Sequence, residues 1–337
     1  MAKRPEQPGD STRAVHAGQR GAPESDAITT PIYQTATYWF RDSAELKAFQ
    51  EGKLERDEYG RYGNPTWRAA ERKLAELENG DEAVLFASGM CAATTAFLAL
   101  LPRGGHMVVT SECYRRTRQF IDEYLVKMDI ETTVIEPADP KKLADALRDD
   151  TVLFFTESPT NPYLRVIDVA EAARVCHARG AKVVLDSTFA TPVNHRALDD
   201  GADLVLHSAT KYLGGHNDLM AGAAVGPKEI IGELRKAVGI LGGVTDANTA
   251  YLLLRTFELD ADLDGTTRFI DACQIPYLAP SLGGVESLIE MPAIMSFWDR
   301  TPEERTALGM TDSLVRFSVG IEDTADLIAD LDQALRA

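Results

Sequence analysis

A buried strand that ends in a polar turn is predicted by the stretch Ala202-Asp-Leu-Val-Leu-His-Ser-Ala-Thr-Lys-Tyr-Leu-Gly-Gly-His216. Its apolar residues are followed by two hydroxyl-bearing residues, Ser208 and Thr210, and by a single lysine, Lys211, ahead of a glycine pair. Most lysines of folded proteins lie on exposed surfaces among other charges, so this position is unusual. It indicates an amine nucleophile with hydroxyl groups beside it that can bind a phosphate.

Short apolar segments alternate with amphipathic segments of helical period on the N-terminal side of this stretch. Continuous apolar strands that alternate with helices predict an α/β fold with a doubly wound, mostly parallel sheet. We expect strands at 83–86, 106–110, 131–135, 152–156 and 182–185, and helices at 67–78, 91–101, 114–127, 140–148, 169–179 and 194–200, with a tight turn at 87–90. Thr66 is the expected cap of the first of these helices.

Composition limits the classes of partner. The formal net charge of −17 over 337 residues argues against nucleic acid and anionic membranes. The polar N-terminus lacks the apolar core of a secretory signal, and no apolar run is long enough for a spanning helix. The widely spaced Cys91, Cys113, Cys176 and Cys273 contain no C-x-x-C pair, which favours reduced thiols in a cytoplasmic protein and no metal site.

Polar or glycine residues follow directly after many of the predicted strands. In a doubly wound sheet the carboxyl ends of the strands lie along one edge, where ligands bind. No G-x-G-x-x-G motif accompanies them, so a nicotinamide-binding dehydrogenase is disfavoured. The residues at this edge are Gly89, Tyr114, Asn161, Asp186, Ser208, Thr210 and Lys211.

Pyridoxal phosphate needs a lysine, a carboxylate for its ring nitrogen, donors for its phosphate and a surface for its ring. Lys211 and Asp186 would supply the first two, and Tyr114 would stack on the ring. The Gly89-Met90 turn, with the two hydroxyls beside the lysine, would bind the phosphate at a helix N-terminus. Each residue alone also has a structural interpretation, as a helix cap, a half-buried aromatic or a turn contact. Their joint position at strand ends favours the cofactor site.

Several motifs resemble the Cys/Met-metabolism family of fold-type I pyridoxal phosphate enzymes, most closely plant-like cystathionine γ-synthases. The resemblance covers the chain from about residue 11 to its end. The matching stretches are Glu58-Tyr-Gly-Arg-Tyr-Gly-Asn-Pro-Thr66, Ala87-Ser-Gly-Met-Cys91, Cys113-Tyr-Arg115, Phe155-Thr-Glu-Ser-Pro-Thr-Asn-Pro162, Thr188-Phe-Ala-Thr-Pro192, Leu206-His-Ser-Ala-Thr-Lys-Tyr-Leu-Gly-Gly-His-Asn-Asp218, Pro280-Ser-Leu-Gly-Gly-Val-Glu-Ser287 and Leu314-Val-Arg-Phe-Ser318.

The resemblance implies a homotetramer built as a dimer of dimers, in which Tyr59 and Arg61 reach the phosphate of a neighbouring subunit. It implies an N-terminal extended arm over 1–60, a pyridoxal phosphate-binding domain over 61–250 and a smaller, apparently truncated C-terminal α/β domain over 251–337. Proline and alternating apolar residues at 28–38 independently favour an extended arm.

The resemblance also assigns a substrate site. Arg316 would bind the α-carboxylate with help from Asn161 and Ser281, and Glu286 and Glu58 would tune the chemistry at Cγ. The implied reaction is γ-replacement, which joins L-cysteine to an activated homoserine ester to give cystathionine in transsulfuration and methionine biosynthesis. The leaving group is not readable from these residues, although the plant-like character favours phosphate.

Other activities remain open. The family also contains cystathionine γ- and β-lyases and methionine γ-lyases, and the last are disfavoured because Arg115-Arg116 follows Tyr114. A non-catalytic paralogue, kept as a binding or oligomerisation partner, is the alternative from a different class.

Near residues 255–257 the chain joins two family blocks that normally lie roughly 55–60 residues apart, by ordinary element lengths. The two family blocks meet in register at this join, so the sequence predicts an internal deletion. The site residues lie on both sides of it. We therefore expect the chain to retain cofactor binding, and the join puts its catalytic activity in question.

Overall fold

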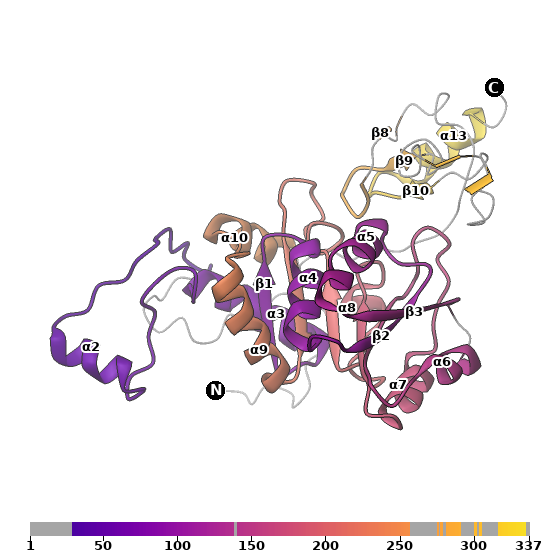
Figure 1. Ribbon diagram of the computed structural model, residues 1–337. Helices are drawn as coiled ribbons and strands as arrows, with labels where there is room; N and C mark the ends of the chain where they lie inside the picture. The colour runs from indigo at the N-terminus through magenta and orange to yellow at the C-terminus, as the bar shows by residue number, and fades with distance from the viewer. Residues whose placement is uncertain are drawn as a thin grey trace, which may run out of the picture.

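The computed structural model describes residues 29–137, 140–256, 275, 277–278, 281–290, 300–301, 303–304 and 316–334. Cys273, Pro280 and the residue that follows the predicted join, Phe257, lie outside these ranges. The described part contains a larger α/β body and a small sheet near the C-terminus (Figure 1).

Seven strands form the main sheet in the order β1-β7-β6-β5-β4-β2-β3. Adjacent strands from β3 to β6 run parallel, whereas β7 is antiparallel to both of its neighbours. The predicted mostly parallel α/β sheet is therefore confirmed. The strands are β1 (Glu82–Phe86), β2 (His106–Thr110), β3 (Glu131–Ile135), β4 (Thr151–Glu157), β5 (Lys182–Asp186), β6 (Leu204–His207) and β7 (Gly222–Gly226).

Helices cover both faces of this sheet (Figure 1). One buried core joins the sheet to α4, α5 and α9, a second joins it to α6 and α7, and a third joins α3 and α10 to β1 and β7. Leu74 of α3 and Leu253 of α10 are fully buried in the third core. The helices are α3 (Pro65–Glu78), α4 (Gly89–Leu100), α5 (Arg115–Glu123), the 3₁₀ turn η1 (Leu125–Met128), α6 (Pro140–Ala146), α7 (Val169–His177), α8 (Thr191–Asn194), α9 (Lys228–Leu241) and α10 (Ala247–Thr256).

Three local predictions are wrong. The expected helix at 194–200 is the four-residue α8 at Thr191–Asn194, followed by turns. Asn64, not Thr66, caps α3: its side chain accepts a hydrogen bond from the Thr66 amide, and Pro65 occupies the first turn, where no amide is needed. The helix predicted at 114–127 is interrupted, because α5 ends at Glu123 and a 3₁₀ turn follows.

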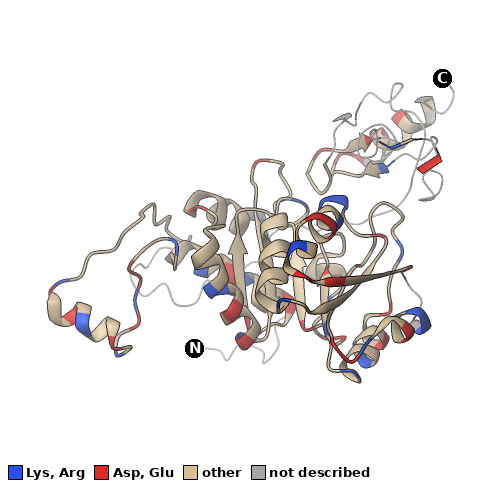
Figure 2. Cartoon of the chain, viewed as in Figure 1, with Lys and Arg blue, Asp and Glu red and all other residues tan. Residues whose placement is uncertain are grey.

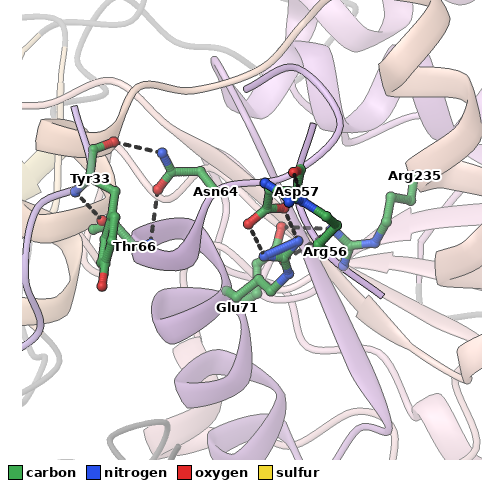
Figure 3. A network of polar contacts seen from close by, with 8 residues as sticks. Tyr33, Arg56, Asp57, Asn64, Thr66, Glu71 and Arg235 are labelled. Carbon is green, nitrogen blue, oxygen red and sulfur yellow. Dashed lines mark hydrogen bonds and ion pairs between the residues drawn. The ribbon is translucent and has the colours of Figure 1, made fainter. Parts of the chain in front are cut away.

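Residues 29–60 contain one helix, α2 (Ser43–Gln50), which is followed by turns and stands away from the main sheet in Figure 1. Their start is fixed to α3: Thr66 Oγ1 donates to the Pro31 carbonyl at 3.0 Å and accepts from the Tyr33 amide at 3.0 Å, and Asn64 Nδ2 donates to the Tyr33 carbonyl at 2.7 Å (Figure 3). Farther along, Trp39 is 76% exposed. The described part of the predicted arm also contacts the body through the Asp57–Arg68 ion pair and through Gln34, which accepts from Asn248, whereas α2 has no buried residue.

The small sheet contains β8 (Tyr277–Leu278), β9 (Leu288–Glu290) and β10 (Arg316–Ser318), and the helix α13 (Thr324–Ala334) follows. Acidic residues in Figure 2 are spread over many elements, with basic residues between them. Among the described helices none is long and apolar enough to cross a membrane, and the described residues contain no cluster with the composition of a metal site.

Candidate active site

The candidate site lies where β1, β4, β5 and β6 end. These strands point the same way, because β7 is antiparallel to both β1 and β6. Their carboxyl ends therefore bring Gly89, Glu157, Asp186 and the turn after β6 to one edge of the sheet.

Lys211 lies in the turn that follows β6, four residues beyond its last residue. Its Nζ donates to Ser281 Oγ at 3.0 Å, so the C-terminal part of the chain reaches the lysine. Burial, and secondarily the nearby Arg316, lower the pKa of Lys211. An amine with a lowered pKa is more readily neutral, which is the form that attacks an aldehyde and accepts a proton.

Gly283 allows the C-terminal part of the chain to lie close to the turn that carries Lys211. A Cβ at this position would lie 2.4 Å from the Tyr212 amide nitrogen and 2.8 Å from the Lys211 carbonyl carbon, and the residue has a positive φ of 75°. Only glycine fits this backbone contact without strain. The neighbouring Gly284 forms a parallel bridge with Gly215.

Asp186 ends β5. Its Oδ1 accepts hydrogen bonds from the amide of Thr188 at 3.0 Å and from the Thr188 hydroxyl at 2.5 Å. Burial raises the pKa of Asp186, although the two bonds from Thr188 and the nearby His207 oppose the shift. No lysine or arginine of the described ranges forms an ion pair with this carboxyl, so its charge lacks a strong cationic partner among those residues.

The turn between β1 and α4 packs directly on Ser208. A Cβ at Gly89 would lie 2.7 Å from the Ser208 Cβ, and one at Gly222 would lie 2.1 Å from the Ser88 carbonyl oxygen. Ser88 caps α4 by accepting from the Cys91 amide. In the described part of the chain the amides of Gly89 and Met90 donate to no protein acceptor, which leaves them for an anion at the helix N-terminus.

Tyr114 precedes α5 and is 46% exposed. Its amide donates to Glu157 Oε2 at 2.8 Å, so the last residue of β4 fixes the backbone from which the aromatic ring projects.

Arg316 lies on β10, and its charge acts on Lys211. Its Nη1 forms an ion pair with Glu290 Oε1 at 3.1 Å, and its Nη2 donates to the Ser281 carbonyl at 2.8 Å. Burial lowers the pKa of Arg316, and Glu290 opposes that shift. Arg316, Ser281 and Lys211 therefore form one contiguous group.

Other predicted residues have different neighbours. The Thr210 hydroxyl donates to the Ala221 carbonyl at 3.1 Å and accepts from the Ala221 amide at 2.9 Å, so its proton is already used. Glu286 Oε2 accepts from Asn217 Nδ2 at 2.7 Å. Asn161 lies after β4, before a cis peptide bond to Pro162.

Tyr59, Arg61 and Glu58 lie in the segment before α3. The Arg61 guanidinium lies 5.5 Å from the ring centre of Tyr59 and 5.0 Å from that of Tyr62, and its Nε is buried without a hydrogen-bond partner. The Glu58 carbonyl accepts from the Tyr38 amide at 3.0 Å. The described side-chain contacts of Tyr59 and Arg61 are therefore local.

Three polar residues of the site were not predicted as functional. Thr188 links the Asp186 carboxyl to the Ser208 amide, which donates to its hydroxyl at 2.8 Å, and Glu157 and Glu290 lie beside the predicted residues. The spacing Asp-Ser-Thr after an apolar strand is typical of an Asx turn and could have identified Thr188. Nothing in the local sequence distinguishes the two glutamates from exposed ones.

These groups fit pyridoxal phosphate. The free amides at the start of α4 suit its phosphate, the buried Asp186 carboxyl without a strong cationic partner suits a protonated ring nitrogen, and the Lys211 amine suits its aldehyde. The combination defines the class of lysine-dependent α/β enzymes that use this cofactor.

Comparisons with known proteins agree with that class. The family described as Cys/Met metabolism PLP-dependent enzyme matches residues 11–256 and 255–336. This chain belongs to that family and is therefore a pyridoxal phosphate-dependent enzyme.

Several relatives are cystathionine γ-synthases. The chain is 45% identical over 386 residues to cystathionine gamma-synthase 1, chloroplastic, of Nicotiana tabacum, covering 97% of this chain and 72% of the relative. It is 33% identical to L-methionine gamma-lyase of Pseudomonas putida, covering 98% of each protein. Among solved structures, metB from Corynebacterium glutamicum is similar with a TM-score of 0.88 and 31% identity, covering 99% of each chain.

Proposed function

We propose that this chain catalyses γ-replacement between L-cysteine and an activated homoserine ester and so forms cystathionine. The proposal rests on a difference in sequence identity between two groups of relatives. Identity to the plant cystathionine γ-synthases is 45% and 43%, whereas identity to methionine γ-lyases and cystathionine lyases is 33–34%.

When bound, pyridoxal phosphate would withdraw electrons from the amino-acid substrate and acidify its Cα and Cβ protons. Lys211 would hold the aldehyde of the cofactor and, once displaced by the substrate amine, accept the Cα proton. Its lowered pKa, caused first by burial, keeps the amine able to do so. Asp186 would hold the ring nitrogen, and Tyr114 would cover the ring.

The phosphate group would be held by the Gly89 and Met90 amides and by Ser208, with Thr210 closing the turn behind it through Ala221. Tyr59 and Arg61 would complete this site in a neighbouring subunit. Support comes from Tyr59, which is 43% exposed, and from the Nε of Arg61, which has no hydrogen-bond partner among the described residues. The corresponding assembly would be a homotetramer of two dimers.

Arg316 would bind the substrate α-carboxylate, with Asn161 and Ser281 beside it. The bonds from its guanidinium to Glu290 and to the Ser281 carbonyl fix its orientation before substrate arrives. Glu286 and Glu58 would act near Cγ. A cytoplasmic location stays a prediction, and the names of two plant relatives include the word chloroplastic.

A steady-state assay with cysteine and each of three esters, succinyl-, acetyl- and phosphohomoserine, tests the reaction. We expect cystathionine with at least one ester, and no product from an R316A variant at the same substrate concentration. Release of an α-keto acid and ammonia without cystathionine would instead support a lyase, and intact cofactor binding without either product would support the non-catalytic alternative.

The proposed internal deletion is supported by two findings. The family matches the chain in two blocks that meet at residues 255–256. The alignment to the tobacco enzyme spans 386 positions, whereas 97% of 337 residues is about 327, so about 59 positions have no counterpart here. Sequencing the transcript tests whether the deletion is natural. A transcript that encodes about 55–60 additional residues at this point would assign it to the gene model.

A further inference from the structure

Glu157 is a buried carboxyl to which the proposed reaction gives no role. It is the last residue of β4 and is only 3% exposed. It lies in register with Asp186, the last residue of the adjacent parallel strand β5. In-register residues of neighbouring parallel strands point to the same face, and the strands are about 4.8 Å apart. Two carboxyls therefore share one buried corner of the site.

The described residues around this corner do not supply enough positive charge to neutralise two carboxylates. Asp186 receives both hydrogen bonds from Thr188 and is stabilised further by His207, whereas Glu157 accepts only the Tyr114 amide in the described part of the chain. Neither carboxyl forms an ion pair with a described lysine or arginine. The Cys113 thiol close to Glu157 is buried and would add no positive charge. The Arg118 guanidinium, which also acts on that thiol, forms an ion pair with Asp122 at 3.2 Å.

When two carboxyls interact strongly, the one with weaker stabilisation of its anion keeps the proton. Burial first, and Asp186 second, raise the pKa of Glu157 well above its ordinary value, and the bond from Tyr114 only partly opposes this. A protonated carboxyl still accepts the Tyr114 amide through its carbonyl oxygen. The contact is therefore compatible with a neutral side chain.

We propose that Glu157 is a positioning residue that stays neutral at physiological pH and holds the backbone of Tyr114, while Asp186 carries the single negative charge of the pair. The inference rests on the proposed function, because it takes Tyr114 as the residue that covers the cofactor ring. A neutral Glu157 leaves Asp186 free to act as the partner of the ring nitrogen without a second anion beside it.

Two variants test the inference. Glu157→Gln is neutral and keeps an acceptor, whereas Glu157→Leu has nearly the same volume and no acceptor. We expect E157Q to bind pyridoxal phosphate within about threefold of the wild type, and E157L to bind about tenfold more weakly, because the Tyr114 amide then loses its acceptor. The amide of Tyr114 should exchange with solvent at least about tenfold faster in the E157L apoprotein.

Infrared difference spectra of the apoprotein provide a readout that does not depend on activity. Wild type minus E157Q should show the C=O band of a protonated carboxyl at about pH 7. The matched control is E112Q, since Glu112 forms an ion pair with Arg165 at 2.7 Å and accepts from the Thr160 hydroxyl, and its removal should leave that band unchanged.

The proposal is overturned if the band is absent from the difference spectrum, or if E157Q loses as much cofactor affinity as E157L. If E157L does not fold, the infrared spectrum and the affinity of E157Q still decide. A Y114A variant separates this inference from the proposed function: unchanged cofactor affinity in Y114A would reject the ring-covering role, whereas the infrared band tests the charge of Glu157 alone.

Discussion

Substitution of Gly89 by alanine should open the proposed phosphate site. The added Cβ would lie 2.7 Å from the Cβ of Ser208 and 2.8 Å from its Cα, and these atoms are held by the turn after β6. The start of α4 must therefore move away from Ser208. Binding of a phosphate requires α4 to return toward Ser208, which brings the added Cβ back into overlap with that residue. Overpacking of this kind costs about 1–3 kcal/mol, which corresponds to roughly a 5- to 150-fold loss of pyridoxal phosphate affinity.

The assay is a titration of the apoprotein with pyridoxal phosphate, followed by the visible absorbance of the bound cofactor. Gly232→Ala in α9 is the matched control, because a Cβ there meets no heavy atom within 4 Å. That change should leave cofactor affinity unchanged and stabilise the helix by up to about 1 kcal/mol. Equal cofactor affinities for G89A and G232A would refute the assignment of the α4 N-terminus to the phosphate.

Three further predictions concern charged groups. Glu71→Ala should lower the free energy of unfolding by about 1–3 kcal/mol in urea titrations, because the Leu85 amide would lose its acceptor and Arg235 would lose its ion pair (Figure 3 shows Glu71 and Arg235). Arg235 keeps its bond to the Ala83 carbonyl, and an unchanged free energy of unfolding would contradict this prediction. Arg316→Lys should raise the KM for the homoserine ester at least about tenfold with a smaller change in kcat, because lysine cannot keep the forked contacts to Glu290 and Ser281. An unchanged KM would mean that the substrate α-carboxylate binds elsewhere. A carboxyl with a raised pKa binds more protons in the folded than in the unfolded state, so ionisation of Glu157 destabilises the apoprotein as pH rises. In thermal unfolding the stability of E157Q relative to wild type should therefore increase from about pH 5 to about pH 8. A stability difference that stays constant over this range would contradict the prediction.

The pattern of apolar residues in the sequence predicts most strands of the main sheet. Strands β2 and β3 have the predicted bounds, because their apolar or β-branched residues are uninterrupted and are bounded by glycine or acidic turns. Strand β7 was not predicted, since Gly222-Ala-Ala-Val-Gly226 has low strand propensity. Close packing explains its composition: Gly222 lies against the Ser88 carbonyl, where a side chain would not fit.

The candidate site was predictable to the extent that it follows strand ends. Asp186 ends β5, and Gly89 and Lys211 follow β1 and β6. These three strands point the same way, although the antiparallel β7 lies between β1 and β6, so the sheet topology brings the residues to one edge. The contacts that hold them come from residues far away in sequence. Glu157 meets Tyr114 across 43 positions, and Ser281 meets Lys211 across 70, so local patterns contain no signal for either contact.

The most direct test of the account is to identify the residue that bonds to the cofactor. The holoprotein would be reduced with borohydride, which fixes pyridoxal phosphate covalently to its lysine, and the digested peptides would be analysed by mass spectrometry. The account predicts a single labelled site at Lys211 and none in a K211A variant. Labelling at another lysine, or a holoprotein that gives no labelled peptide, would contradict it.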